Sequence, residues 1–401
     1  MPWPDKDNPV ERDSAKIRAL VSLVAEKLMS MKAAEEGFAE NPKTSSSVNA
    51  LERLMARDEL YRMEVVSKIS VQPEEVVIGL QRYAWALKLN TFVIDSKENA
   101  ERLAEILNSR SANAGNPLSA EGIIAHDTIS ISFCDLMPSY EEEVYALDTL
   151  GNARVAYAPE PGWTVFQMLD KTTNADFVNE SFQQRQVTVH RKLKKRAEQH
   201  FAVLYLKQFF TRPIAMDSVM FRILADTLLA IMRTDSAGHR QEGFFGIRGD
   251  DVENVRLALA PQLATPFITM GDYVVSIEDV IHELKFFPVR FTSLRRNSFF
   301  KTLNQNIQPI AEAAFLSQEA LHRRLNERPE VRRDLNVWVD AMQADKLLKY
   351  LLDSLGRAYD SVQFDGSDTL FMTLRSVESK AIETINRYVS GLANTYDVEI
   401  N

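Results

Sequence analysis

The chain has 401 residues, of which 45% are apolar and 26% are charged, so it can form two to three domains with real hydrophobic cores. Its 56 acidic against 47 basic side chains give a net charge of −9, which argues against nucleic acid as the main partner because phosphate binding needs a basic surface. Cys134 is the only cysteine, which excludes an intrachain disulfide and a cysteine-rich metal site.

The first residues, 1–7, carry neither a basic region nor the apolar stretch of an export signal. No stretch approaches the roughly 20 apolar residues that a membrane-spanning helix needs. We therefore expect a soluble chain without a transmembrane segment. Either it is intracellular, or a secretion signal, with a lipid-anchor cysteine as one form, lies upstream.

Helical periodicity dominates the N-terminal segment, residues 14–83. Apolar residues recur at steps of three and four from Leu20 to Met31, and the same period resumes at Val48 after the polar break 41–47. This pattern predicts amphipathic helices.

The pattern changes to strand alternation at Lys88–Ile94, inside a segment that we delimit as residues 84–172. Ser96 can cap a following helix, residues 108–116 form a small-residue loop, and a short helix at Tyr140–Leu147 precedes two further strands. We predict a small antiparallel sheet with helices around it, in which Lys88–Ile94 and Trp163–Leu169 are neighbouring strands.

A helical connector follows at residues 173–264. It begins with a long helix from about Gln186 to Phe210, whose basic run 191–196 we interpret as a solvated face, and Pro213 ends it. The glycines of 236–251 lack the dinucleotide-binding spacing and predict a mobile loop. A second helical segment, 265–401, contains a capping box at Ser276 and Asp279.

An internal repeat links the two helical segments. Leu28–Val65 aligns without gaps to Phe315–Leu352, so that apolar positions match and the proline break falls at the same place. The matched pairs include Ser30 with Ser317, Ala33 with Ala320, Pro42 with Pro329, and Leu60 with Leu347. Chance similarity between amphipathic helices is the alternative. Methionines such as Met29 and Met55 either line an adaptable groove or pack in the core.

Residues 148–169 resemble the last two strands of a parvulin-type prolyl isomerase domain, and Leu89–Val93 falls on the first strand of that pattern. The helical repeat, with its charged turns at Gly37–Pro42 and Leu325–Leu335, resembles the chaperone segments of SurA- and PrsA-type foldases. The closing residues 396–401 are similar to the tails of such proteins. The resemblance implies an α+β, mostly α-helical chain with a parvulin-like small antiparallel sheet domain inserted between two SurA-N-like helical regions.

The same resemblance places a degenerate site on the sheet. Asn90 and Thr164 stand where the family has histidines, and Asp127 lies in residues 125–129, which map onto the family's G-G-D-L-G stretch. Thr128, Leu136 and Tyr140 replace the residues that hold the substrate proline, and Trp163 adds apolar surface for substrate binding. We expect Asn90 and Thr164 to hydrogen-bond each other. Because both histidines are replaced, isomerase activity is expected to be weak or absent.

The resemblance thus implies an ATP-independent, extracytoplasmic (periplasmic) foldase-chaperone that binds unfolded or exported client polypeptides, with no cofactor and no metal. Two alternatives are open: an active parvulin-type prolyl isomerase with an atypical polar cluster, and a structural subunit that holds one fixed partner.

Overall fold

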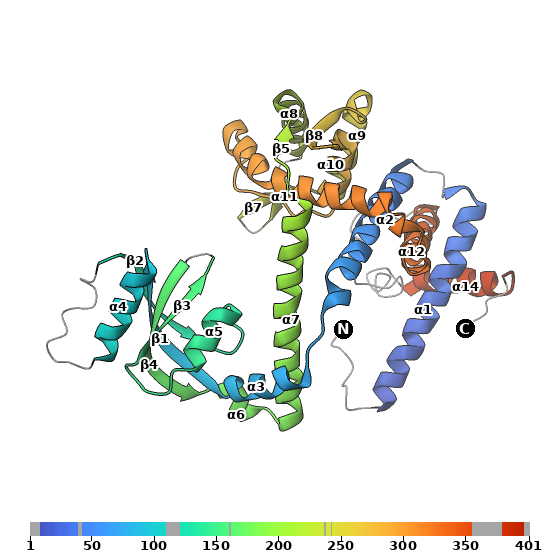
Figure 1. The fold of residues 1–401 in the computed structure, drawn as a ribbon. Coiled ribbons are helices and arrows are strands. Elements are labelled where there is room, and N and C mark those ends of the chain that lie inside the picture. Colours follow the sequence, from blue (N-terminus) through green and yellow to red (C-terminus); the bar gives the residue numbers. More distant parts are fainter. Residues whose placement is uncertain are drawn as a thin grey trace. The chain divides into compact units, whose positions relative to one another are not determined.

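A computed structural model describes residues 9–38, 42–109, 121–159, 162–235, 238–241, 243–354 and 379–396. The small-residue loop and the C-terminal tail of the sequence patterns therefore lie largely outside the described residues. The chain is mostly helical with a small antiparallel sheet, as the sequence predicts (Figure 1). It divides into two compact units, residues 62–210 and residues 1–61 with 211–401.

The unit of residues 62–210 is built on a four-stranded antiparallel sheet in the order β2-β1-β4-β3 (Figure 1). Its strands are β1 (Trp85–Ile94), β2 (Ile123–Ile131), β3 (Ala153–Ala158) and β4 (Gly162–Thr173). The predicted pairing of Lys88–Ile94 with Trp163–Leu169 is confirmed. The first strand is longer than its alternation suggested, because Trp85 and Ala86 continue the ladder to Thr173 and Thr172.

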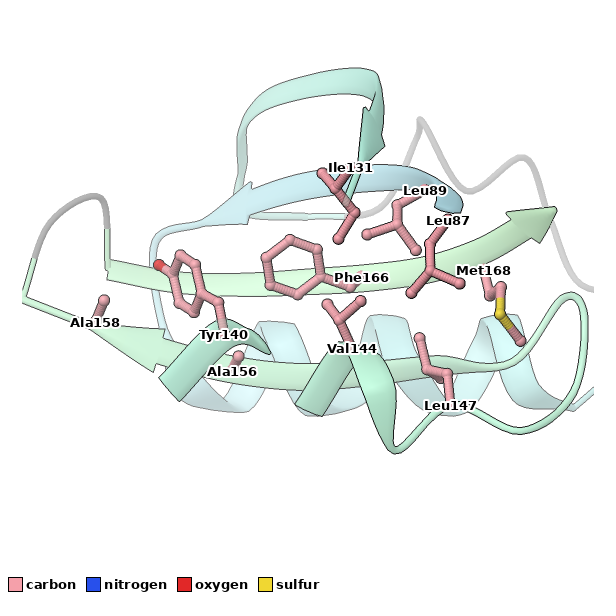
Figure 2. Packing of buried hydrophobic residues seen from close by; sticks show 10 residues of the cluster. All are labelled: Leu87, Leu89, Ile131, Tyr140, Val144, Leu147, Ala156, Ala158, Phe166 and Met168. Atoms are coloured by element: carbon pink, nitrogen blue, oxygen red, sulfur yellow. The ribbon is translucent and has the colours of Figure 1, made fainter. Parts of the chain in front are cut away.

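Each face of this sheet carries its own helix and core. Helix α4 (Lys97–Asn108), capped by Ser96 as predicted, covers one face, and α5 (Pro138–Tyr145) covers the other. Figure 2 shows the α5 face, where Tyr140, Val144 and Leu147 meet Phe166 and Leu89. The α4 face buries a second set: Phe92, Ile94, Ala100, Leu103, Ala104, Ala153 and Val165. Burial on both faces fixes the register of the strands.

Helices at the foot of the sheet complete this unit. They are η2 (Val66–Lys68), α3 (Pro73–Tyr83), α6 (Ala175–Asn179) and α7 (Phe182–Phe209). Helix α7 begins four residues before the predicted start, because Ser181 and Gln184 form a capping box. Gly79 lets α3 approach α7 closely, since a Cβ atom there would lie 2.6 Å from Val189.

The other unit contains the helices of the proposed repeat. They are α1 (Pro9–Glu35), α2 (Pro42–Glu64), α11 (Arg296–His322), η5 (Leu325–Glu327), α12 (Pro329–Ser354) and α14 (Ser379–Ala393). In both repeat segments a helix is followed by a second helix that starts at a proline. The predicted polar break 41–47 is wrong over its described residues, because 42–47 belong to α2. Met29 packs in the core between α1, α12 and α14, which decides against a groove at this position.

A mixed region, residues 214–291, completes the same unit. Its helices are α8 (Ser218–Thr234), α9 (Gly249–Ala258), η4 (Ala260–Gln262) and α10 (Ile277–Leu284). Its strands, β5 (Ile214–Met216), β6 (Arg240–Gln241), β7 (Phe244–Gly246), β8 (Pro266–Met270), β9 (Tyr273–Ser276) and β10 (Arg290–Phe291), form two small sheets. The capping box at Ser276 and Asp279 is confirmed.

The glycine-rich stretch contains regular structure as well as loop. Among its described residues, β6 and β7 pair as a hairpin, and buried His239 bonds the carboxylate of Asp251 at 2.8 Å. This bond ties the hairpin to the first turn of α9. Within the part of the chain that the structure describes, no helix has the length and apolar character needed to cross a membrane.

Candidate functional site

Asn90 lies on β1 in a row of polar side chains that crosses three strands. Its amide donates to Gln167 at 3.2 Å, and its carbonyl accepts from the Thr128 hydroxyl at 2.9 Å. Gln167 and Thr128 are the direct cross-strand partners of Asn90 in the ladders to β4 and β2. Cross-strand partners share a face, and this row lies on the α4 face with Phe92 and Val165.

Thr164 belongs to the opposite face. Its side chain is buried and lies 3.0 Å from the hydroxyl of Tyr140, which donates to the Gly162 carbonyl at 2.9 Å. Tyr140 is part of the α5-side core in Figure 2, as are Phe166 and Met168, which follow Thr164 at steps of two along β4.

The expected bond between Asn90 and Thr164 is therefore absent from this arrangement. On β4, Gln167 and Thr164 are three positions apart, so they point to opposite faces, and Asn90 follows Gln167. Each of the two polar side chains has its own partners on its own face. The structure does not bring the two family-equivalent positions into one site.

The remaining predicted site residues divide in the same way. Leu136 packs with Tyr140 on the α5 side, whereas Trp163 packs on the α4 side, where its ring is tilted against that of Tyr157 with centroids 4.7 Å apart. Asp127 and Thr128 are exposed on the edge strand β2, and the Asp127 carboxylate accepts the Thr128 backbone N–H at 2.7 Å. Leu136 and Trp163 therefore lie on opposite faces of the sheet, and only Leu136 shares a core with Tyr140.

A buried ionic cluster that was not predicted from the sequence is centred on Glu141 of α5. The Glu141 carboxylate is fully buried, and it accepts from Arg82 of α3 at 3.2 Å and from Arg196 of α7 at 3.0 Å. It also accepts the backbone N–H of Cys134, and Lys192 donates to the Phe133 carbonyl. The basic run 191–196 is therefore only partly a solvated face, because Lys192 and Arg196 turn inward.

This cluster holds several elements of the unit together. It connects α5, the loop after β2, α3 and α7, and each oxygen of the Glu141 carboxylate is bound by one guanidinium group. Burial raises the pKa of the Cys134 thiol to about 11, so the thiol stays protonated at neutral pH and is a poor nucleophile. The backbone of Cys134 adopts a left-handed conformation with φ 69°, which is uncommon for a residue other than glycine.

A second candidate surface lies on α1. Ile17, Leu20 and Val21 are 42% to 63% exposed, and they continue at helical spacing into Val24 and Leu28, which pack in the core with α12. The apolar stripe of α1 is thus covered only in its C-terminal half. Among the described residues no group of three or more His, Cys, Asp or Glu side chains is arranged to hold a metal ion.

No protein-family model and no curated protein matches the chain. Among solved structures it is similar to foldase protein PrsA from Streptococcus pneumoniae str. Canada MDR_19A, with 12% identity and a TM-score of 0.23. The match covers 49% of this chain and 90% of that chain. A likeness of this degree carries neither a fold assignment nor a function.

Proposed function

We propose that the chain is an ATP-independent foldase-type chaperone that binds unfolded or extended polypeptides outside the cytoplasm. In this proposal residues 84–172 are a degenerate parvulin-like domain, inserted between helical segments, that does not catalyse prolyl isomerisation.

The observation that carries the proposal is the exposed apolar stripe of α1. Ile17, Leu20, Val21 and Leu23 are large apolar side chains on two consecutive turns, and each is at least 42% exposed. Contiguous exposed apolar surface is typical of protein interaction sites. Such a stripe binds without sequence-specific contacts, which suits clients that share only apolar character.

The loss of catalysis is supported by the sheet. A parvulin-type site needs a polar cluster beside an apolar pocket, whereas Asn90 and Thr164 point from opposite faces. The hydroxyl of Tyr140 is already engaged by Gly162 and Thr164. The barrier of about 18–20 kcal/mol for X-Pro rotation would then be left unchanged.

Aggregation of reduced, unfolded α-lactalbumin in the presence of the chain tests the chaperone function. We expect suppression of light scattering without ATP, and a clear loss of protection in the Leu20→Ser/Val21→Ser double variant. Val203→Ser/Leu204→Ser is the matched control, because this adjacent pair on α7 is similarly exposed, each at 49%. No protection by the unsubstituted chain, or equal protection by all three proteins, contradicts the proposal.

A tetrapeptide isomerisation assay on the same samples tests the catalytic part. We expect background rates. Fractionation of cells that make the native protein tests the compartment, with recovery outside the cytoplasm expected.

A further inference from the structure

A cavity of about 400 Å³ opens in the unit of residues 62–210, between α3, the start of β1, α6 and the start of α7. Its walls are mainly apolar and include Leu80, Trp85, Phe177 and Phe182. Arg185 is the only charged residue of the lining. The volume is at the small end of the roughly 300–1,000 Å³ of small-ligand sites, which suits one or two amino-acid side chains.

The charge of Arg185 is not matched. Its guanidinium carbon lies 3.9 Å from the centre of the Phe177 ring, and its buried Nε has no hydrogen-bond partner. No carboxylate of the described residues is within ion-pair distance of it. Arg82 and Arg196 of the same unit, by contrast, both bind Glu141. A buried guanidinium N–H without an acceptor is costly, and a carboxylate is its best-matched partner.

The apolar surface continues beyond the cavity. Phe182 is 63% exposed, Val178 beside Phe177 is similarly exposed, and Ile78 lies one turn before the lining residue Gln81 on α3. An extended chain can therefore place one side chain in the cavity and lie across these neighbours. Gln81 and the indole N–H of Trp85 are the uncharged polar groups of the lining, too few to recognise a sugar or a nucleobase.

We propose that the cavity and the apolar surface beside it form a groove that binds an apolar side chain of an extended polypeptide together with an adjacent carboxylate. Client segments in which Leu or Phe adjoins Asp or Glu should then bind best. The inference rests on the proposed chaperone function and assigns a sequence preference to it. Apolar burial in the cavity supplies binding, and the carboxylate completes the coordination of Arg185.

Titration calorimetry with two uncharged-end peptides tests this preference. The probe is acetyl-Gly-Ser-Leu-Phe-Asp-Ser-Gly-amide, and its control replaces Asp by Asn. We expect the Asp peptide to bind the full chain about tenfold more tightly, because a charge-assisted bond is lost with Asn. Arg185→Gln should remove this difference, and Arg185→Lys should retain part of it.

Phe182→Ser should weaken both peptides by about fivefold, since the substitution removes apolar contact but no charge. The controls are Lys195→Gln and Val187→Ser, which change an exposed charge and an exposed apolar residue on the same helix outside the lining. Both should leave the two affinities unchanged. Circular dichroism of each variant confirms that it is folded.

The outcomes separate this inference from the chaperone proposal. If the chain suppresses aggregation but binds both peptides equally, or if Arg185→Gln keeps the difference, the groove assignment is overturned and the chaperone function stands. If the chain gives no protection but prefers the Asp peptide through Arg185, the groove stands as a peptide site and the chaperone function falls.

Discussion

Ser30 and Ser317 occupy equivalent positions in the two helical hairpins, and each is hydrogen-bonded to the second helix of the other hairpin. The Ser30 hydroxyl donates to Asp340 of α12 at 2.6 Å, and the Ser317 hydroxyl accepts from Arg57 of α2 at 3.3 Å. Both serines are buried. This reciprocity is what a duplicated hairpin packed against its own copy would give, and we propose that the repeat is a true duplication.

We expect Ser30→Ala and Ser317→Ala each to lower the free energy of unfolding by about 1 kcal/mol. The cost stays modest because Asp340 keeps its ion pair with Lys27 and Glu283 keeps Arg57. Urea unfolding measures the change, with the exposed Ser218→Ala as the control. If either buried substitution is as neutral as the control, the hydrogen bond makes no net contribution to stability.

Removal of Arg57, the cation between the two hairpins, should lower the free energy of unfolding more than the loss of either serine hydroxyl does. In the Arg57→Met variant the buried carboxylate of Glu283 loses its cationic partner and keeps only the Ser317 hydroxyl, and we expect a destabilisation of about 3 kcal/mol. The double variant Arg57→Met/Glu283→Gln should recover part of this loss, because no uncompensated charge remains. A double variant that is less stable than the single one would show that the pair is not the source of the effect.

His282 should make stability fall in mild acid. Both of its ring nitrogens are buried without hydrogen-bond partners among the described residues. Burial first, and then the positive charge of Arg53, lowers its pKa to about 4, with Lys285 and Arg256 acting in the same direction and Asp279 opposing them. The folded protein therefore resists protonation of a group that titrates near 6.5 when unfolded.

Its contribution to stability is present above pH 6.5 and is lost as the pH falls from 6.5 to 4, up to about 3 kcal/mol in total. Urea unfolding at a series of pH values should show this slope, and His282→Leu should reduce it. His322→Gln, which changes an exposed histidine of the same unit, should not. An unchanged slope in the His282 variant would assign the acid sensitivity to other groups.

The sequence predicted the pairing of β1 with β4 because alternation over Lys88–Ile94 reports directly on a half-buried strand. It did not predict which face each side chain takes, since that depends on the register between strands. Here the ladder is unbroken from Leu89 and Met168 to Ile94 and Trp163, and its register pairs Asn90 with Gln167 and Thr164 with Val93. An alignment to a family pattern therefore placed Asn90 and Thr164 in strands without fixing their faces.

The Glu141 cluster was beyond sequence reasoning for a different reason. Its arginines lie 59 and 55 residues away, and nothing local distinguishes Glu141 from the acids beside it, Glu142 and Glu143. Only the packing of α3 and α7 on α5 brings the three side chains together. Charged residues are mostly exposed in folded proteins, so a charged stretch of sequence predicts a solvated surface. The residues of a buried ion pair therefore look the same in the sequence as surface residues.

Because Asn90 and Thr164 lie on opposite faces of the sheet, a double substitution can test why isomerase activity is expected to be absent. If the chain lacked isomerase activity only because two histidines were replaced, Asn90→His/Thr164→His would restore it. We expect no gain, because the two imidazoles would point from opposite sides of the sheet and only the one at position 164 would adjoin Tyr140. A prolyl tetrapeptide assay on the folded double variant measures this, with each single variant as its control. Thr164→His should also reduce stability by about 1–3 kcal/mol, because a larger side chain enters a filled core. Acceleration that requires both histidines would show that the two positions do form one site, and the non-catalytic interpretation would be wrong.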